Sequence, residues 1–428
     1  MSASREPGQT LRSFLSRRVI GPLQAFVAIE ASSGLVLLAA TVAALVWANS
    51  PWGSQYTALW ARHFSFEFAR VALHMDYEHV VNDGLMAVFF FVVGLEIKRE
   101  LVRGELASPR KAMLPVAAAF GGMFVPALIF VAWNFGGDGA HGWGIPMATD
   151  IAFALGALAL LGRRAPFPLK VFMLALAIVD DLGAILVIAL FYTDHIALAA
   201  VAWAVVLVAI LITLLRLGVR SRPVYLVLGL LFWLAVYKSG IHATVAGVVL
   251  AALTPAGPRA RSNTTTAAAA TGADALPAEP EAALDSLERM LHPWVSYLIV
   301  PVFALANAGL MLSTGLLRDA STSHVTLGIA MGLVVGKPAG VLVFSWLALR
   351  FGGARLPEGM TGQQLIGGGL LAGIGFTVSL FITGLAFGSV ALTNDAKAGI
   401  FAASLVSGLL GTAWLLVTGG GAEASRPT

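Results

Sequence analysis

Residues 144–192 read GIPMATDIAFALGALALLGRRAPFPLKVFMLALAIVDDLGAILVIALFY. This stretch holds two apolar runs, each long enough to approach or cross a lipid bilayer, joined by a turn that contains two arginines. Three carboxylates lie within the runs, at Asp150, Asp180 and Asp181. Each charged side chain at the centre of a membrane costs roughly 2.5–3.5 kcal/mol on the more lenient scales. Three of them so close together therefore indicate a functional site inside a membrane-embedded helix bundle.

The composition places the whole chain among membrane proteins. Of its 428 residues, 58% are hydrophobic and only 12% are charged, whereas an ordinary soluble domain has about 25% charged residues. The mean hydropathy is +0.84, and apolar runs recur along the entire chain, which favours one integrated bundle over several soluble domains. The chain has no cysteine, which excludes disulfides and thiolate metal sites. We therefore predict an all-α polytopic membrane protein.

Twelve apolar segments have about the length that a membrane-spanning helix needs, near 20 residues. They lie at residues 31–48, 80–97, 112–133, 145–162, 167–192, 196–215, 222–237, 240–254, 293–312, 324–349, 364–388 and 397–418. An even number of transmembrane helices places both termini on one side of the membrane. Most of the 27 Lys and Arg residues fall in the connections on that side, and this asymmetry marks it as cytoplasmic. The asymmetry also accounts for the net charge of +4 without a nucleic-acid partner.

The connections divide the chain into five regions. They are a cytoplasmic N-terminal segment at 1–30, spans one to eight at 31–254, a cytoplasmic linker at 255–287, spans nine to twelve at 288–418 and a cytoplasmic tail at 419–428. The outer connection at 50–79 contains HFSFEF at residues 63–68. This strict alternation predicts a β-strand, one arm of an external hairpin that could pair with another subunit. An irregular loop fits the segment equally well.

Spans three to five and ten to twelve share one property, which is that the middle helix of each trio is interrupted. Span four begins with Gly-Ile-Pro at 144–146, and span eleven contains glycines at 367–369, 373 and 375. Interrupted helices are tolerated in a membrane only where the freed backbone groups face protein or a water-filled cavity. The trios lie seven spans apart, so they cross the membrane in opposite directions. Paired interrupted helices in inverted-topology repeats are typical of the binding site of a secondary transporter.

The adjacent aspartates Asp180 and Asp181 cannot share one environment. Neighbours on a helix point about 100° apart, so one side chain can line an aqueous cavity while the other faces an adjacent helix. Lys337 is the one Lys or Arg far from the ends of a predicted span, since Lys170, Arg222 and Lys397 lie within four residues of a span end. We expect Lys337 to pair with Asp180, which leaves Asp181 for the cavity. Such carboxylates titrate as a coupled pair and can hold either protons or a hard cation such as sodium. A structural buried salt bridge would account for Asp180 and Lys337, but not for Asp181 or Asp150.

Thr149 and Asp150 follow the predicted break in span four. The N-terminal end of a half-helix carries partial positive charge, and the C-terminal end carries partial negative charge. If the breaks of spans four and eleven meet, Asp150 would compensate the N-terminal ends and Lys337 the C-terminal ends. Thr149 could add an oxygen ligand. A simple helix N-cap is the equally weighted alternative for Asp150.

Other charged residues lie at the ends of the predicted spans. Asp83, at the outer end of span two, could guide cations toward the site or act as an interfacial cap. Glu96, Arg99 and Glu100 lie at the cytoplasmic end of the same span, where ordinary interfacial charges are common. His292 precedes a proline at a helix start, and histidine titrates in the range that a pH switch needs.

Long sequence blocks follow one another along the chain. They read NDGLMAVFFFVVGLEIKREL, ATDIAFALGALALLG, LAIVDDLGAI, SGIHATVAGV, LHPWVSYLIVPVFALANAG, GKPAG and GIGFTVSLFI. In this order they resemble the NhaA family of bacterial sodium/proton antiporters, and the resemblance covers roughly residues 15–415. Blocks of this length are very specific.

The resemblance implies a twelve-span antiporter of the bacterial inner membrane that exports sodium or lithium in exchange for protons. It also implies electrogenic, pH-regulated exchange and a homodimer formed through the external hairpin. Asp181 would be the cation ligand and proton carrier with Asp180 beside it, so sodium would bind at these two residues, while Lys337 and Asp150 would serve the helix crossing. Arg289 stands where some members have histidine. The family's regulatory cluster at the cytoplasmic face maps to Glu96, Arg99, Glu100, Glu288 and His292.

The sequence therefore predicts a secondary active transporter that works by alternating access around the aspartate pair. It would not be an enzyme, and it would need no cofactor beyond the transported ions, with membrane lipids around it. A sodium-coupled solute symporter is the alternative within transport, although the core has few polar groups to recognise a solute. An intramembrane aspartyl protease needs two aspartates, from different helices, that share one proton. Asp180 and Asp181 are adjacent on one predicted helix, which disfavours this alternative.

Overall fold

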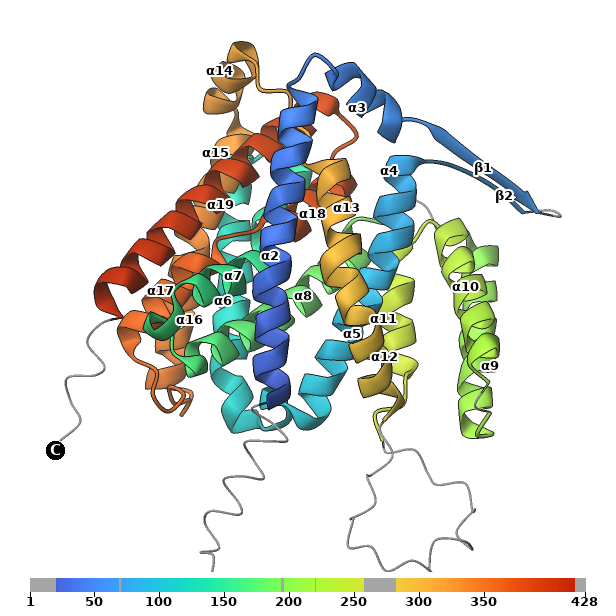
Figure 1. Ribbon diagram of the computed structural model, residues 1–428, viewed down its shortest axis with the longest axis horizontal. Coiled ribbons are helices and arrows are strands. Elements are labelled where there is room, and N and C mark those ends of the chain that lie inside the picture. The colour runs from blue at the N-terminus through green and yellow to red at the C-terminus, as the bar shows by residue number, and fades with distance from the viewer. Residues whose placement is uncertain (1–20, 69–70, 194–195, 220, 258–281, 420–428) are drawn as a thin grey trace, which may run out of the picture. The chain divides into compact units, whose positions relative to one another are not determined.

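The computed structural model describes residues 21–68, 71–193, 196–219, 221–257 and 282–419 (Figure 1). Most of the predicted N-terminal segment, most of the linker and nearly all of the predicted tail lie outside these residues. The chain divides into two compact units, and each unit combines stretches from both sides of the linker. Unit 1 consists of Met1–Arg62, Met113–Ala184 and Val300–Thr428, and unit 2 consists of His63–Ala112 and Ile185–Ile299.

The described residues of unit 1 contain helices and no strand. Its elements are α2 (Gly21–Ala48), α3 (Gly53–Trp60), the 3-10 helix η4 (Ala140–Met147), α7 (Ile151–Leu160), the 3-10 turn η5 (Gly162–Arg164), α13 (Val300–Asn307), α14 (Thr314–Thr322), α15 (His324–Met331), the π-helical turn η7 (Gly332–Gly336), α16 (Lys337–Arg350), α17 (Gly362–Ala372), α18 (Phe376–Ala386) and α19 (Val390–Thr418). The boundaries of the units fall within α6 (Pro109–Trp133) and α8 (Phe167–Phe191), which therefore contribute residues to both.

Unit 2 adds a two-stranded sheet to its helices. Its elements are β1 (His63–Phe68), β2 (Val71–Asp76), α4 (Tyr77–His79), the π-helical turn η2 (Val80–Leu85), α5 (Met86–Arg103), the 3-10 turn η3 (Glu105–Ala107), α9 (Leu198–Arg216), α10 (Arg222–Ser239), α11 (Thr244–Leu253), α12 (Ala283–Trp294) and the π-helical turn η6 (Val295–Ile299). β1 and β2 are antiparallel, with His63 opposite Asp76 and Phe68 opposite Val71. The strand predicted from the alternation in HFSFEF is thus confirmed, and the irregular loop is wrong.

The apolar helices make the chain a multi-pass membrane protein. Among the described residues, nine helices are long and apolar enough to cross a membrane, or ten if the bent pair Ser32–Ala48 and Gly53–Trp60 counts as one span. The twelve predicted spans are therefore matched only in part. The predicted span 240–254 corresponds to α11, which has ten residues, and the predicted span 222–237 corresponds to α10, which has a charged residue near each end.

Two helices of unit 1 are interrupted where proline or glycine occurs. In the predicted span 145–162, η4 ends at Met147, the next three residues are not helical, and α7 begins at Ile151. In the predicted span 364–388, α17 ends at Ala372 and α18 begins at Phe376. A side chain at Gly373 would have its Cβ 2.5 Å from the carbonyl oxygen of Leu333. The second break therefore requires glycine because a neighbouring backbone approaches it closely.

Glycine also allows close approach between helices of unit 2. A Cβ added to Gly94 of α5 would lie 2.7 Å from the Cβ of Ala251 of α11. A Cβ added to Gly247 of α11 would clash with the backbone of α5 at Ala87. Small residues at such contacts let helix backbones approach one another in a membrane, where van der Waals packing drives association. α5 and α11 are therefore a tightly fitted pair.

Candidate ion-binding site

The non-helical residues before α7 lie against the break between α17 and α18. The backbone amide of Asp150 donates to the carbonyl of Ile374 at 2.6 Å. The Asp150 carboxylate accepts from the amide of Phe153 at 3.0 Å through one oxygen. Its other oxygen accepts from the amide of Thr377 at 3.0 Å and from the Thr377 hydroxyl at 2.6 Å. One buried carboxylate thus caps the N-terminal ends of both α7 and α18, where the helix dipoles favour negative charge.

Thr149 joins this crossing to the aspartate pair. Its hydroxyl oxygen lies 2.6 Å from Oδ2 of Asp180 and 2.9 Å from the carbonyl oxygen of Ala372. Ala372 is the last residue of α17, so its carbonyl has no acceptor role within the helix. A hydroxyl group has a single hydrogen to donate, so Thr149 serves only one of these two oxygens at a time.

Lys337 is the cation of the site and is completely buried. Its ammonium group lies 2.5 Å from Oδ2 of Asp180, and both side chains have 0% exposure. The same group donates to the carbonyl of Met147, the last residue of η4. Lys337 therefore neutralises a carboxylate and caps the C-terminal end of a half-helix at once. Its pairing with Asp180 is the one that charge balance in the sequence suggests.

The two adjacent aspartates on α8 are both buried in unit 1. Asp180 is 1% exposed and Asp181 is 6% exposed. Oδ1 of Asp180 accepts no hydrogen bond from any described residue, so a carboxylate oxygen with free lone pairs lies beside the Lys337 contact. Among the described residues, no group of three or more His, Asp or Glu side chains is arranged to hold a metal ion. Carboxylate, hydroxyl and carbonyl oxygens lie close together near Asp180, and such oxygens are the ligands that hard cations prefer.

The predicted regulatory residues come together in unit 2. Arg99 of α5 donates to Glu288 of α12 and lies 3.5 Å from a carboxylate oxygen of Glu100. His292 of α12 lies 3.5 Å from Glu96 of α5. We call these five residues, Glu96, Arg99, Glu100, Glu288 and His292, the charge cluster. Arg103 and Asp285 extend it with an ion pair at 2.8 Å.

Asp83 has a different contact in unit 2. It is part of η2 in unit 2, directly before α5, and its backbone carbonyl accepts from the indole of Trp233 at 3.0 Å. None of the hydrogen bonds of Thr149, Asp150 or Lys337 described above reaches Asp83. A role for Asp83 in cation entry stays a prediction.

The sequence matches known proteins over nearly its whole length. Residues 24–415 match the family described as Na+/H+ antiporter 1. The chain belongs to this family. A protein of Rhodopirellula baltica named Na(+)/H(+) antiporter NhaA is 46% identical over 422 residues, which covers 94% of this chain and 95% of that protein. A Syntrophotalea carbinolica protein named Na(+)/H(+) antiporter NhaA 2 is 48% identical, covering 91% and 95%. A protein of Escherichia coli O1:K1 named Na(+)/H(+) antiporter NhaA is 47% identical, covering 92% and 98%.

Several groups that contact the predicted site residues are not among those predicted. Thr377 is the clearest case, since it holds Asp150 by both its amide and its hydroxyl. Its signal was present in the motif that follows the glycine break, where a polar residue opens a half-helix. The carbonyls of Met147 and Ala372 had no signal, because every residue carries a carbonyl. Arg103 and Asp285 could have been found, since each lies one turn from a predicted cluster residue on the same helix.

Proposed function

We propose that this protein is an electrogenic secondary transporter that exchanges intracellular sodium or lithium for external protons. Its relatives are named sodium/proton antiporters, and they align with this chain over nine tenths or more of their own length and of this chain. The single observation that carries the proposal is the completely buried contact of Lys337 with Asp180, directly beside Asp181. Ionisable groups inside a membrane are expensive and mark ion pathways.

In the proposed mechanism, cation and proton compete for the aspartate pair. Asp181 and Asp180 supply carboxylate oxygens to the cation, and the same oxygens take protons when the cation leaves. Lys337 neutralises Asp180 in the absence of the cation, as its 2.5 Å contact with that side chain suggests. Because the site does not hold cation and protons together, export of a cation is coupled to import of protons. Return of more protons than the charge of one cation makes the exchange electrogenic.

The crossing half-helices would hold the site residues and would move with them during transport. Asp150 compensates the N-terminal ends of α7 and α18, and Lys337 compensates the C-terminal end of η4. We propose that the interrupted elements belong to inverted repeats of a twelve-span bundle, so that alternating access moves this crossing relative to the rest. Thr149 adds a hydroxyl oxygen to the site, and Asp83 guides cations toward it from the outside.

The proposal includes regulation, location and assembly. The charge cluster adjusts exchange to pH, because histidine is the residue type that ordinarily titrates near neutral pH and His292 lies 3.5 Å from Glu96. The protein lies in the bacterial inner membrane with both termini in the cytoplasm, which the distribution of Lys and Arg along the chain favours. The β1–β2 hairpin offers strand edges through which a second copy could bind.

Exchange can be tested in everted or reconstituted vesicles that hold an acid-sensitive dye inside. Sodium or lithium added outside should dissipate the pH gradient of the wild-type protein. Asp181→Asn should abolish this response, whereas Asp138→Asn, at an exposed aspartate, should leave it unchanged. Exchange by the Asp181→Asn protein at the wild-type rate would overturn the site assignment. Solute accumulation without proton movement would instead favour a sodium-coupled symporter.

A further inference from the structure

Lys98 of α5 faces α11, away from the charge cluster that its neighbours form. Its ammonium group donates to the carbonyls of Ala252 at 2.5 Å and Thr254 at 2.6 Å. α11 ends at Leu253, so these carbonyls belong to the group that a helix leaves unsatisfied at its C-terminal end. A cation there is favourable because the end of the helix carries partial negative charge. Lys98 therefore caps a helix other than its own.

The cytoplasmic end of α5 contacts α12 and α11 through different kinds of interaction. Toward α12 it forms the charged contacts of Arg99 with Glu288 and of Glu96 with His292. Toward α11 it forms the two hydrogen bonds of Lys98, and α11 itself carries no charged residue. The fit between Gly94 and Ala251 adds close packing on the same side. A shift of α5 caused by a change of charge in the cluster would thus reach α11 through Lys98 and this packing.

The start of α12 is tied to the end of α11 as well. The amide of Leu284 donates to the carbonyl of Pro255 at 3.3 Å. Leu284 also packs with Leu95 of α5 and Ala251 of α11 in one buried cluster. The three helices therefore meet at one junction, and Lys98 supplies the charged contact between α5 and α11 there.

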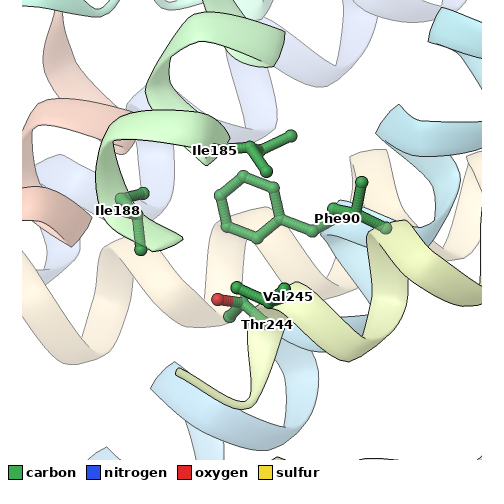
Figure 2. Close-up of a pocket in the computed structure, with 6 residues that line it drawn as sticks. Phe90, Ile185, Ile188, Thr244 and Val245 are labelled. Carbon is green, nitrogen blue, oxygen red and sulfur yellow. The ribbon is translucent and has the colours of Figure 1, made fainter. Parts of the chain in front are cut away.

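The opposite half of α11 packs against the part of α8 that follows the aspartates. Thr244, Val245 and Val248 of α11 lie together with Phe90, Ile185 and Ile188 around a small gap (Figure 2). The walls are apolar apart from the hydroxyl of Thr244. A shift of α11 would therefore reach the part of α8 that follows Asp181 through these apolar side chains.

We propose that Lys98 is a positioning residue that passes the charge state of the cluster from α5 to α11. The proposal rests on the proposed pH regulation, and it assigns the mechanical contact through which that regulation leaves the cluster. The charged and titratable groups around α5 at this end are Glu96, Arg99, Glu100 and Arg103 of α5, Asp285, Glu288, Arg289 and His292 of α12, Glu105 of η3 and Lys111 of α6. A helix cap with a purely structural role would change stability and leave the pH profile unmoved.

The test measures the pH profile of sodium-driven proton exchange in proteoliposomes. Lys98→Met removes the ammonium group and keeps an unbranched apolar side chain. We expect the ratio between the highest and lowest rates across the pH range to fall about fivefold, which is the low end of ordinary coupling between sites. Lys98→Arg can donate to the same two carbonyls and should restore the wild-type ratio. Lys111→Met, at an exposed surface pair, is the matched control and should leave the ratio unchanged.

Three results would overturn the proposal. One is a Lys98→Met profile identical to those of the wild type and of Lys111→Met. Another is an equal loss in Lys98→Met and Lys98→Arg, since the arginine keeps the donors. The third is a wild-type rate that does not depend on pH, which would remove the proposed regulation and the Lys98 contact with it. If Lys98→Met does not fold, Lys98→Gln keeps one donor group and should show a smaller fall of the same kind.

Discussion

The ionic contacts at the helix crossing and those of the charge cluster use the same residue types in different surroundings. The side chains of Lys337 and Asp180 have 0% exposure, whereas Arg103 and Asp285, at the edge of the cluster, are 44% and 27% exposed. Removing one partner from a buried pair leaves an uncompensated charge and costs about 3–5 kcal/mol. An exposed pair is worth only about 0–1 kcal/mol. The buried pair at the crossing is therefore expected to contribute more to stability than the exposed pair at the edge of the cluster.

The largest expected effect on stability comes from removing the buried cation at the crossing. Lys337→Ala should lower the free energy of unfolding by about 3–5 kcal/mol, because Asp180 would be left as a buried charge without its cation. The thermal midpoint of the purified protein in detergent measures this loss, and Lys111→Ala is the exposed control.

A double replacement sharpens the same test. Lys337→Met combined with Asp180→Leu removes both charges, so it should recover most of the stability while exchange stays abolished. A midpoint for Lys337→Ala that matches the wild type would show that the buried contact contributes nothing, and the contrast with the cluster would be lost.

A smaller effect is expected from the hydroxyl that lies between the two half-helices. Thr149→Val preserves the shape of the side chain and removes the hydrogen that Asp180 and Ala372 share. The loss of a donor to buried oxygens should cost about 1–3 kcal/mol, again measured as a lower thermal midpoint. Thr149→Ser keeps the hydroxyl and should remain close to the wild type. Equal losses in both variants would assign the effect to the methyl group of the threonine.

The smallest effect is expected at the edge of the cluster. Arg103→Ala breaks the ion pair with Asp285 and should change stability by about 0–1 kcal/mol, because the arginine side chain is nearly half exposed. Added salt should reduce this difference further by screening the pair. A thermal midpoint as low as that of Thr149→Val, unaffected by salt, would break the comparison between the two regions.

Sequence patterns located both regions but not the contacts that complete them. The glycines of span eleven and the Gly-Ile-Pro of span four marked the two interruptions, because these residues disfavour helix continuation. Charge balance inside the membrane pointed from Lys337 to Asp180. No pattern could show that Lys337 also binds the carbonyl of Met147, since backbone acceptors are the same at every residue.

Side-chain direction was the second limit of the sequence. Lys98 stands between charged neighbours, which made it resemble an ordinary interfacial cation. Its role depends on α11 ending within reach, and helix ends are set by tertiary packing as much as by local preference. The predicted span at 240–254 is longer than α11 because Ile241 and Ala243, directly before Thr244, continue the apolar run.

The hydrogen bond between Leu284 and Pro255 has a consequence for how this family can vary. It brings together the two ends of the connection between α11 and α12. The positions of these two helices therefore do not depend on the length of the chain between those ends. Doubling a closed loop of this kind costs only about 0.6 kcal/mol in chain entropy. We therefore expect a longer connection here to have little effect on folding. This connection is the place where evolution, or a protein engineer, can add a segment without disturbing the transport core.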